Sequence, residues 1–449
     1  MHPYPQKGIT ARQKGPVNRF MEKIVINGGH PLFGQVEISG SKNAALPIIY
    51  ASVLVKGKCV LENIPDVSDI RTSFEILRGI GARIRMLSRG TWEIDCTDVT
   101  CGESDYELVR SIRGSYYLLG SEFGRFGHAK VGLPGGCNFG VRPIDQHIKG
   151  FEALGGRVST EGGYVEIESD KGAAGTNIFF DLSSVGATLN VMIAAATADG
   201  VTVIDNAARE PHVVDCANFL NTCGAQISGA GSDVIKIKGV KELHGCTYAI
   251  IPDMIEAGSF MVAAVATRGS VKITNVIPKH LESVTAKLIE TGAEVEEFDD
   301  AVMVTAGSEV KRTSVKTLPY PGFPTDMHPQ MAALLCTAEG TSYINESIFE
   351  NRFRYVEELR RMGARIKVDG RILVIEGGAP LSPAPVIATD LRGGVAVMIA
   401  ALTCPGTTEI SQIRLIERGY DDICGKLRSL GADIKKITVP DEIPLPQAN

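Results

Sequence analysis

The sequence lacks an apolar run long enough to cross a membrane. Its aliphatic stretches are interrupted by glycine, threonine or a charged residue before they reach the roughly 18 residues that a spanning helix needs. Residues 1–20 are basic and lack the apolar stretch of a secretory signal, so we expect a disordered N-terminal extension and a cytoplasmic protein. The net charge is −6 and no basic block occurs, which argues against nucleic acid or an anionic membrane as a partner.

Cysteine is sparse, at 10 of 449 residues, and it is scattered along the chain. A disulfide scaffold would need far more, so we expect mostly buried free thiols. The nearest pair, Cys96 and Cys101, has no second Cys or His pair at zinc-finger spacing, and the sequence therefore predicts no metal site. The sequence also has neither a P-loop nor a dinucleotide-binding fingerprint, which argues against the common nucleotide-binding folds that carry these motifs.

What the chain does contain is an internal repeat. A glycine that follows a segment of helical period and precedes a β-branched run recurs about every 70 residues. Glycine at this place is typical of a helix C-terminal cap before a strand. The six tag glycines are Gly81, Gly155, Gly224, Gly292, Gly363 and Gly431.

Each unit also contains an earlier, more apolar helix followed by a β-rich run, as in "GVAVMIAALTCPG" and "TTEISQ". The unit is therefore βαβαβ-like, and six such units exceed what one hydrophobic core can hold. We expect an α/β protein of two lobes with three units each. The first lobe would span residues 43–251, and the second would combine residues 21–42 with 252–449, so that the chain crosses between lobes twice.

Polar residues recur at the start of the apolar helix in all six units. Ser and Asp at such positions are ordinary N-caps, whereas a cation there meets the unfavourable end of the helix dipole. A second set of cations falls near the start of the amphipathic helix. The first set is Lys42, Arg113, Ser184, Asp253, Asp326 and Asp390, and the second is Arg142, Arg352 and Arg418.

Repeated cations at helix N-termini make sense if they converge on a shared anion such as phosphate or carboxylate. A cleft between two lobes is a favoured place for such a site. The alternative is that these side chains are solvated or carboxylate-paired surface charges.

Nine ordered motifs resemble those of the UDP-N-acetylglucosamine 1-carboxyvinyltransferases, which belong with the enolpyruvyl transferases. They are "SKNAALP", "LPGGCNFGVRPIDQHI", "SVGAT", "REP", "PDMIEAG", "FPTDM", "FENRF", "ATDLR" and "ERGYD". The resemblance implies a two-lobed inside-out α/β barrel of six βαβαββ units, in agreement with the repeat. It also implies transfer of the enolpyruvyl group of phosphoenolpyruvate to the 3′-hydroxyl of UDP-N-acetylglucosamine, with release of phosphate, as the first committed step of peptidoglycan synthesis.

The resemblance implies a chemical role for several residues and no metal or cofactor. Cys137 would protonate C3 of phosphoenolpyruvate, would be able to form a covalent adduct with it, and would be alkylated by the epoxide fosfomycin. Asp326 would be the base beside the sugar hydroxyl. Asn43 would contact the tetrahedral intermediate, and the phosphoenolpyruvate-binding cations would be Lys42, Arg142, Arg392 and Arg418.

Other matching positions would hold the nucleotide sugar. They are Arg113, Arg142, Pro143, Ile144, Asp145, Gln146, Ser184, Val185, Gly186 and Ile348. His147 we interpret as structural. Met254 stands where many relatives have an arginine, and Leu182 stands where some have a lysine. We therefore expect weaker or differently arranged contacts to the diphosphate.

Two other functions stay open from the sequence. One is the related transfer to shikimate 3-phosphate by the EPSP synthases, which share the fold and phosphoenolpyruvate. The other is a non-catalytic paralogue that only binds a nucleotide sugar. The cysteine loop and the "RPID" segment favour the nucleotide-sugar acceptor, and simple binding requires neither the thiol nor the base.

Overall fold

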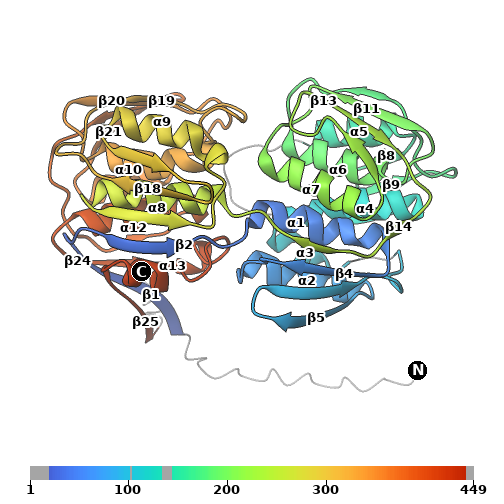
Figure 1. The fold of residues 1–449 in the computed structure, drawn as a ribbon, viewed down its shortest axis with the longest axis horizontal. Coiled ribbons are helices and arrows are strands. Elements are labelled where there is room, and N and C mark those ends of the chain that lie inside the picture. Colours follow the sequence, from blue (N-terminus) through green and yellow to red (C-terminus); the bar gives the residue numbers. More distant parts are fainter. Residues whose placement is uncertain (1–19, 102–103, 134–143, 441–449) are drawn as a thin grey trace, which may run out of the picture.

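The computed structural model describes residues 20–101, 104–133 and 144–440. The expected extension at residues 1–20 lies outside these ranges, except that Phe20 begins strand β1. Two lobes lie side by side, each with its own hydrophobic core (Figure 1). The core of the first lobe draws on residues 44–250, and that of the second lobe on residues 24–38 and 255–434.

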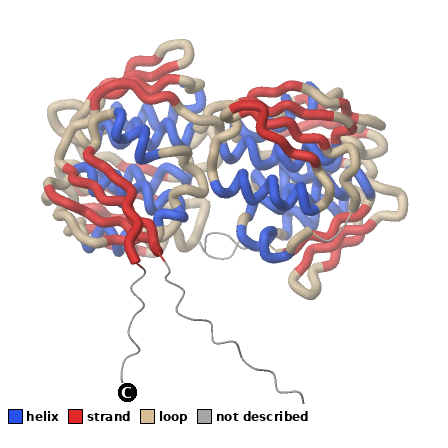
Figure 2. Tube along the Cα trace, turned by 90° about the horizontal axis from the view of Figure 1, so that it is seen from below, coloured by secondary structure: helices blue, strands red, loops and turns tan. Residues whose placement is uncertain are grey.

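Apolar helices occupy the centre of each lobe, with the strands outside them (Figure 2). Segments such as "VGATLNVMIAA" have no polar face, so a helix built from them is buried on all sides. The central helices of the first lobe are α1 (Lys42–Ala51), α4 (Tyr117–Phe126) and α6 (Val185–Ala195), and those of the second are α8 (Met254–Ala266), α10 (His328–Leu335) and α12 (Leu391–Thr403).

The other helices follow the central ones along the chain, one after each except that α2 and α3 both follow α1, and most bury one face and expose the other. They are α2 (Ser68–Gly79), α3 (Tyr106–Ser111), α5 (Asp145–Ala153), α7 (Pro211–Thr222), α9 (Glu282–Glu290), α11 (Tyr355–Arg361) and α13 (Ile423–Ser429). None of the helices in the described ranges has the length and apolar character to cross a bilayer.

Three main sheets and a two-stranded ladder surround the helices of the first lobe. The first sheet is β15 (Thr247–Ala249), β4 (Lys58–Glu62), β6 (Thr91–Asp95) and β5 (Arg83–Ser88). The second is β7 (His128–Gly132), β9 (Tyr164–Glu168) and β8 (Arg157–Ser159). The third is β10 (Asn177–Phe179), β11 (Val201–Asp205), β13 (Val234–Lys238) and β12 (Gln226–Ser228), and the ladder is β14 (Leu243–His244) with β3 (Val55–Lys56).

The second lobe repeats this plan with three four-stranded sheets. The first is β17 (Glu294–Glu297), β18 (Ala301–Thr305), β16 (Ser270–Thr274) and β2 (Phe33–Glu37). The second is β19 (Ser314–Lys316), β20 (Thr341–Asn345), β22 (Ile372–Glu376) and β21 (Arg365–Asp369). The third is β23 (Val386–Ile387), β24 (Gly406–Ser411), β1 (Phe20–Gly28) and β25 (Asp433–Pro440).

The units follow the expected βαβαββ order, with one parallel pair and two antiparallel pairs in each four-stranded sheet. All six tag glycines have positive φ, between 90° and 104°, a region that glycine enters without steric cost. This conformation ends each helix and starts the next strand. The internal repeat therefore reflects a backbone requirement that recurs six times.

In each lobe one sheet is completed by a strand that is distant in the sequence. The early strand β2 pairs with β16 of the second lobe, and the late strand β15 pairs with β4 of the first lobe. The two crossing segments run next to each other, because Ser41 N donates to Ile251 O at 2.7 Å and Asp253 N donates to Ser39 O at 2.9 Å. The start of α1 and the start of α8 are thereby held together between the lobes.

Candidate active site

Two of the expected cations meet on a carboxylate between the lobes. Lys42 is the first residue of α1 and so belongs to the first lobe, one residue before the expected boundary, whereas Arg418 belongs to the second lobe. Lys42 Nζ donates to Asp69 Oδ2 at 3.2 Å, and Arg418 Nε donates to Asp69 Oδ1 at 2.9 Å. The side chains of Lys42, Arg418 and Asp69 are only 12%, 17% and 5% exposed. They are carboxylate-paired, as the alternative from the sequence supposed, but they are not surface charges.

The backbone fixes both cations. Ser41 caps α1 and Asp253 Oδ2 accepts a hydrogen bond from Lys42 N at 3.3 Å, which sets the direction of the first turn. Arg418 was expected at a helix start, and this is wrong, because α13 begins only at Ile423. Arg418 lies instead in the turn after a short 3₁₀ helix at residues 413–415. In this unit the repeat position that arginine occupies is therefore in a loop and not at a helix start.

A second charged cluster surrounds the expected base. Asp326 Oδ1 accepts from Arg352 Nη2 at 2.7 Å, and Asp326 Oδ2 accepts from Arg392 Nε at 3.1 Å. Arg392 is buried at 1% exposure and also lies over the ring of Tyr420 at 5.1 Å. Asp326 keeps 28% of its side chain exposed, so one side of this carboxylate can still be reached.

The charges around Asp326 make it a weak base in this state. Burial alone would raise its pKa, but the charges of Arg352 and Arg392 outweigh burial and hold the pKa well below the usual value for aspartate. Lys42 contributes in the same direction. Lys42 therefore links the two clusters, because it bonds Asp69 and its charge also favours the ionised form of Asp326.

The N-cap interpretation is confirmed for Ser184, Asp253 and Asp390, whose side chains accept from backbone N–H groups of the first turn. Asp326 differs, because its carboxylate bonds two arginines and caps no helix. Among these four positions, Asp326 is the one with ion pairs recorded to arginine side chains within the described residues. Its part in the site is therefore separate from helix capping.

Seven of the ten residues expected to bind the nucleotide lie at or just before helix starts in the first lobe. Ser184, Val185 and Gly186 begin α6, and Asp145 and Gln146 begin α5. Gln146 Nε2 donates to Asp145 Oδ2 at 2.9 Å. Ile144 immediately precedes α5, and Arg113 lies in the short 3₁₀ helix before α4.

His147 connects these two helices as a structural residue. A Cβ on Gly186 would lie 2.8 Å from His147 Nε2, so the two helices approach closely there and glycine is required. Burial, with the charge of Arg113, lowers the pKa of His147 to about 4. A neutral, buried imidazole agrees with the structural interpretation from the sequence.

Three expected site residues, Cys137, Arg142 and Pro143, lie outside the described residues. Asn43 follows Lys42 in α1, and Ile348 is partly exposed, with its N–H bonded to Glu346 Oε1 at 2.8 Å. Among the described residues no recorded contact joins Ile348 to the nucleotide-binding group, and the assignment of each of these residues to a substrate remains a prediction.

Sequence reasoning missed two acidic residues that organise the site. Asp69 reads as an ordinary acidic residue in the first turn of α2, and nothing in its neighbourhood signals a partner in the other lobe. Glu346 is fully buried and accepts from Thr325 Oγ1 at 2.7 Å, while the same Thr325 oxygen accepts from Arg352 Nη1 at 2.8 Å. Glu346 thus orients the segment that carries Asp326.

Comparison with known proteins identifies the family of this arrangement. The profile of the family EPSP synthase (3-phosphoshikimate 1-carboxyvinyltransferase) matches residues 26–427. A UDP-N-acetylglucosamine 1-carboxyvinyltransferase of Clostridium botulinum is 55% identical over 418 residues, which cover 93% of this chain and 100% of the relative. The chain belongs to the UDP-N-acetylglucosamine 1-carboxyvinyltransferase family.

Other members of the family and solved structures agree. The UDP-N-acetylglucosamine 1-carboxyvinyltransferase 2 of Bacillus subtilis is 47% identical over 94% of this chain and 98% of that protein. The enolpyruvyl transferase NikO from Streptomyces tendae superposes with a TM-score of 0.85 at 27% identity, covering 94% of this chain and all of that one. An EPSP synthase from Acinetobacter baumannii has a TM-score of 0.72 at 17% identity over 93% of this chain and all of that one, which shows the shared fold alone.

Proposed function

We propose that this enzyme transfers the enolpyruvyl group of phosphoenolpyruvate to the 3′-hydroxyl of UDP-N-acetylglucosamine and releases inorganic phosphate, as the first committed step of peptidoglycan synthesis. The observation that carries the proposal is the meeting of Lys42 and Arg418, from different lobes, at a buried site. The Asp69 carboxylate accepts the hydrogen bonds that Lys42 and Arg418 would donate to a substrate anion. A phosphate group can take over these donors when the substrate binds.

The steps then fall to named groups. Lys42 and Arg418 hold the phosphate and Arg392 holds the carboxylate of phosphoenolpyruvate, while Cys137 donates a proton to C3. Asp326 takes the proton of the sugar hydroxyl as the hydroxyl oxygen bonds to C2. The tetrahedral intermediate then loses phosphate from C2 and a proton from the C3 methyl group, which returns to the Cys137 thiolate, and the double bond is restored. When the substrate binds, Arg392 pairs with the carboxylate of phosphoenolpyruvate. Arg392 then depresses the pKa of Asp326 less than it does without substrate.

Phosphate release with each acceptor in turn tests the proposal. We expect turnover with UDP-N-acetylglucosamine and none with shikimate 3-phosphate, each offered with phosphoenolpyruvate. The reverse pattern would assign the chain to the shikimate-type reaction. Tight binding of the nucleotide sugar without phosphate release would establish a binding paralogue.

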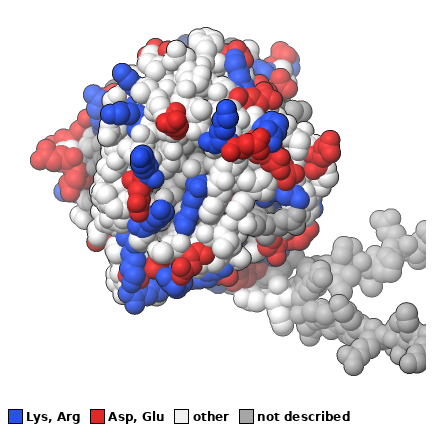
Figure 3. Space-filling view, turned by 90° about the vertical axis from the view of Figure 1, so that its right-hand side faces the viewer, with Lys and Arg blue, Asp and Glu red and all other residues white. Residues whose placement is uncertain are grey.

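We infer that the reaction takes place in the cytoplasm. The nine cysteines in the described ranges form no disulfide, as in proteins of reducing compartments. On the end of the first lobe drawn in Figure 3, positive and negative side chains are interspersed. Such a face suits a protein whose partners are small molecules bound in a local site.

The role of Asp69 as an internal counter-ion predicts an unusual response to phosphate. We expect Asp69→Asn to lower the free energy of unfolding by about 1–3 kcal/mol, because Lys42 and Arg418 lose the carboxylate they share. Added phosphate should raise the midpoint of thermal unfolding more in this variant than in the wild type. Asp66→Asn, which removes the same charge at an exposed position, is the control. An equal phosphate-induced shift of the unfolding midpoint in the wild type, Asp69→Asn and Asp66→Asn would show that Lys42 and Arg418 do not bind phosphate.

Replacing Met254 by a cation should increase the affinity of the enzyme for the nucleotide sugar. Met254 is the first residue of α8 and packs partly against the core of the second lobe. We expect Met254→Arg to lower KM for the nucleotide sugar about fivefold, the effect of one partly exposed charge contact, with kcat unchanged. Met86→Arg, at an exposed strand position, is the matched control. An unchanged KM in Met254→Arg would show that the diphosphate does not lie near this position.

A further inference from the structure

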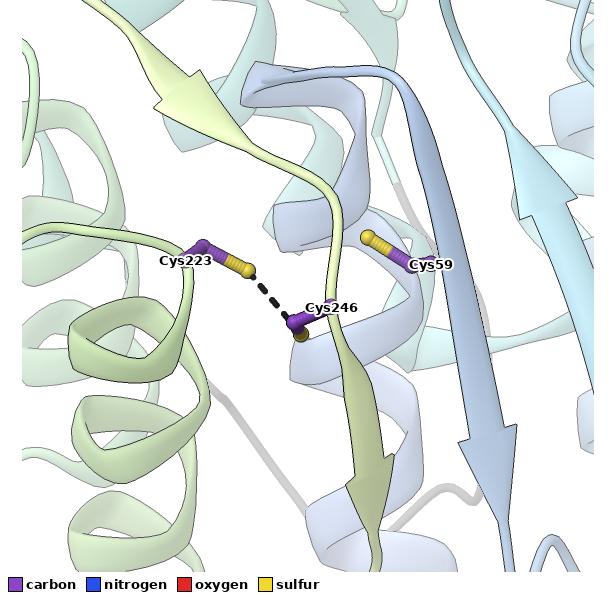
Figure 4. Close-up of side chains that lie close together, drawn as sticks. All are labelled: Cys59, Cys223 and Cys246. Carbon is purple, nitrogen blue, oxygen red and sulfur yellow. Dashed lines mark hydrogen bonds between the residues drawn. The ribbon is translucent and has the colours of Figure 1, made fainter.

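Three cysteine sulfurs from distant parts of the first lobe meet at one point (Figure 4). Cys59 lies on β4, Cys223 directly follows α7, and Cys246 lies between β14 and β15. The Sγ atoms of Cys223 and Cys246 are 3.3 Å apart, and all three sulfurs lie within 4.8 Å of one another. The site is unrelated to the charged groups described above and does not depend on the proposed function.

The backbone holds the three segments together around the sulfurs. Val60 N donates to Cys246 O at 2.8 Å, and His244 N donates to Cys223 O at 2.9 Å. A Cβ on Gly245 would lie 2.2 Å from Lys58 O, so the close approach of this segment to β4 requires glycine. The cluster is thus a built feature of the corner where the third repeat returns to the first.

Burial leaves one side of the cluster accessible. Cys59 and Cys223 are fully buried, and Cys246 is half-buried. An ion can therefore enter past Cys246 and then be shielded from water. At the same corner, a Cβ on Gly224 would lie 3.1 Å from His244 Nε2, and His244 Nδ1 lies 3.1 Å from Gly245 O.

We propose that Cys59, Cys223 and Cys246 bind one thiophilic metal ion, with zinc as the expected occupant. Three thiolates at about 2.3 Å from a tetrahedral zinc ion lie about 3.8 Å apart, which is close to the 3.3 Å between Cys223 and Cys246 and compatible with all three sulfurs lying within 4.8 Å of one another. Binding displaces the three thiol protons to solvent and forms three Zn–S bonds. The fourth position is open to a water molecule.

A disulfide explains the arrangement less well. It needs an S–S bond of about 2.05 Å between two sulfurs and leaves the third without a role. One metal ion uses all three sulfurs and ties β4, the end of α7 and the start of β15 into a single unit. Its expected role is structural, closing the first lobe at the segment that leads into the second.

The full-length protein tests the proposal by metal analysis after zinc loading and gel filtration. We expect one zinc ion per chain, and with cobalt(II) in its place the intense visible bands of a tetrahedral thiolate complex. Cys246→Ser should weaken zinc affinity at least about tenfold, measured by competition with a chromogenic chelator. The control is Cys424→Ser, which removes a half-buried free thiol from the second lobe and should keep the full affinity.

Thermal unfolding gives a second readout. Zinc should raise the unfolding midpoint of the wild type and of Cys424→Ser but not of Cys246→Ser. Equal zinc content and equal affinity in the wild type and Cys246→Ser would overturn the proposal. So would a non-reduced peptide that joins Cys223 to Cys246 in metal-free, freshly purified protein, because this would establish a disulfide in place of the metal.

Discussion

Asp326→Asn should lower kcat by about 10²–10⁴-fold, the usual contribution of a positioned general base. Asparagine keeps the size of the side chain and one acceptor oxygen for an arginine, but it cannot take a proton from the sugar hydroxyl. Arg352 and Arg392 lose the negative partner to which both donate, so we also expect a loss of about 1–3 kcal/mol in the free energy of unfolding. Rates are measured in single turnovers, and unfolding is followed by circular dichroism in urea.

The pH dependence separates a base from a structural counter-ion. A base acts only when deprotonated, so activity falls as pH drops through its pKa. The two arginines depress this pKa in the free enzyme, and the acid limb of kcat/KM should lie below about pH 3.9. Once the substrate engages Arg392, the acid limb of kcat should lie at higher pH.

The exposed Asp299→Asn is the control and should leave both limbs and kcat unchanged. A full kcat in folded Asp326→Asn would show that the carboxylate serves only to hold Arg352 and Arg392. Coincident acid limbs in kcat and kcat/KM would contradict the exchange of partners by Arg392.

The repeat could be predicted from the sequence because its signal is local. Each tag glycine needs a positive φ next to a helix end, and this requirement repeats at nearly constant spacing. The apolar central helices have no polar face and could be recognised in the same way. Their number and spacing were enough for six units and two lobes.

The partners of the site charges could not be predicted because they are set by tertiary structure. Asp69 meets Arg418 across 349 positions of sequence, and Arg392 meets Asp326 across 66. The position within the repeat predicted where the cations lie, but it could not show that these cations are ion-paired with carboxylates of the protein. The cysteine cluster is a similar case, because Cys59 is far from Cys223 in the sequence and only the return of β15 to β4 brings Cys246 between them.

Cys137→Ser should lower kcat by about 10²–10⁴-fold, since a serine hydroxyl is a far weaker acid than a thiol and cannot protonate C3 at neutral pH. The neighbouring Arg142 in the sequence favours the thiolate, so the acid form has to be loaded with its proton together with the substrate. The rate of the wild type should therefore fall on the alkaline side as the thiol ionises. The serine variant should lack this limb.

Mass spectrometry of the intact protein gives an independent measure of the thiol. We expect a covalent adduct with phosphoenolpyruvate and alkylation by fosfomycin in the wild type and in Cys101→Ser, and neither in Cys137→Ser. Retained alkylation with lost turnover would place the reactive thiol elsewhere and leave Cys137 to positioning. Unchanged turnover in Cys137→Ser would require another proton donor for C3, and the low pKa of Asp326 makes that carboxyl unsuitable because it carries no proton at neutral pH.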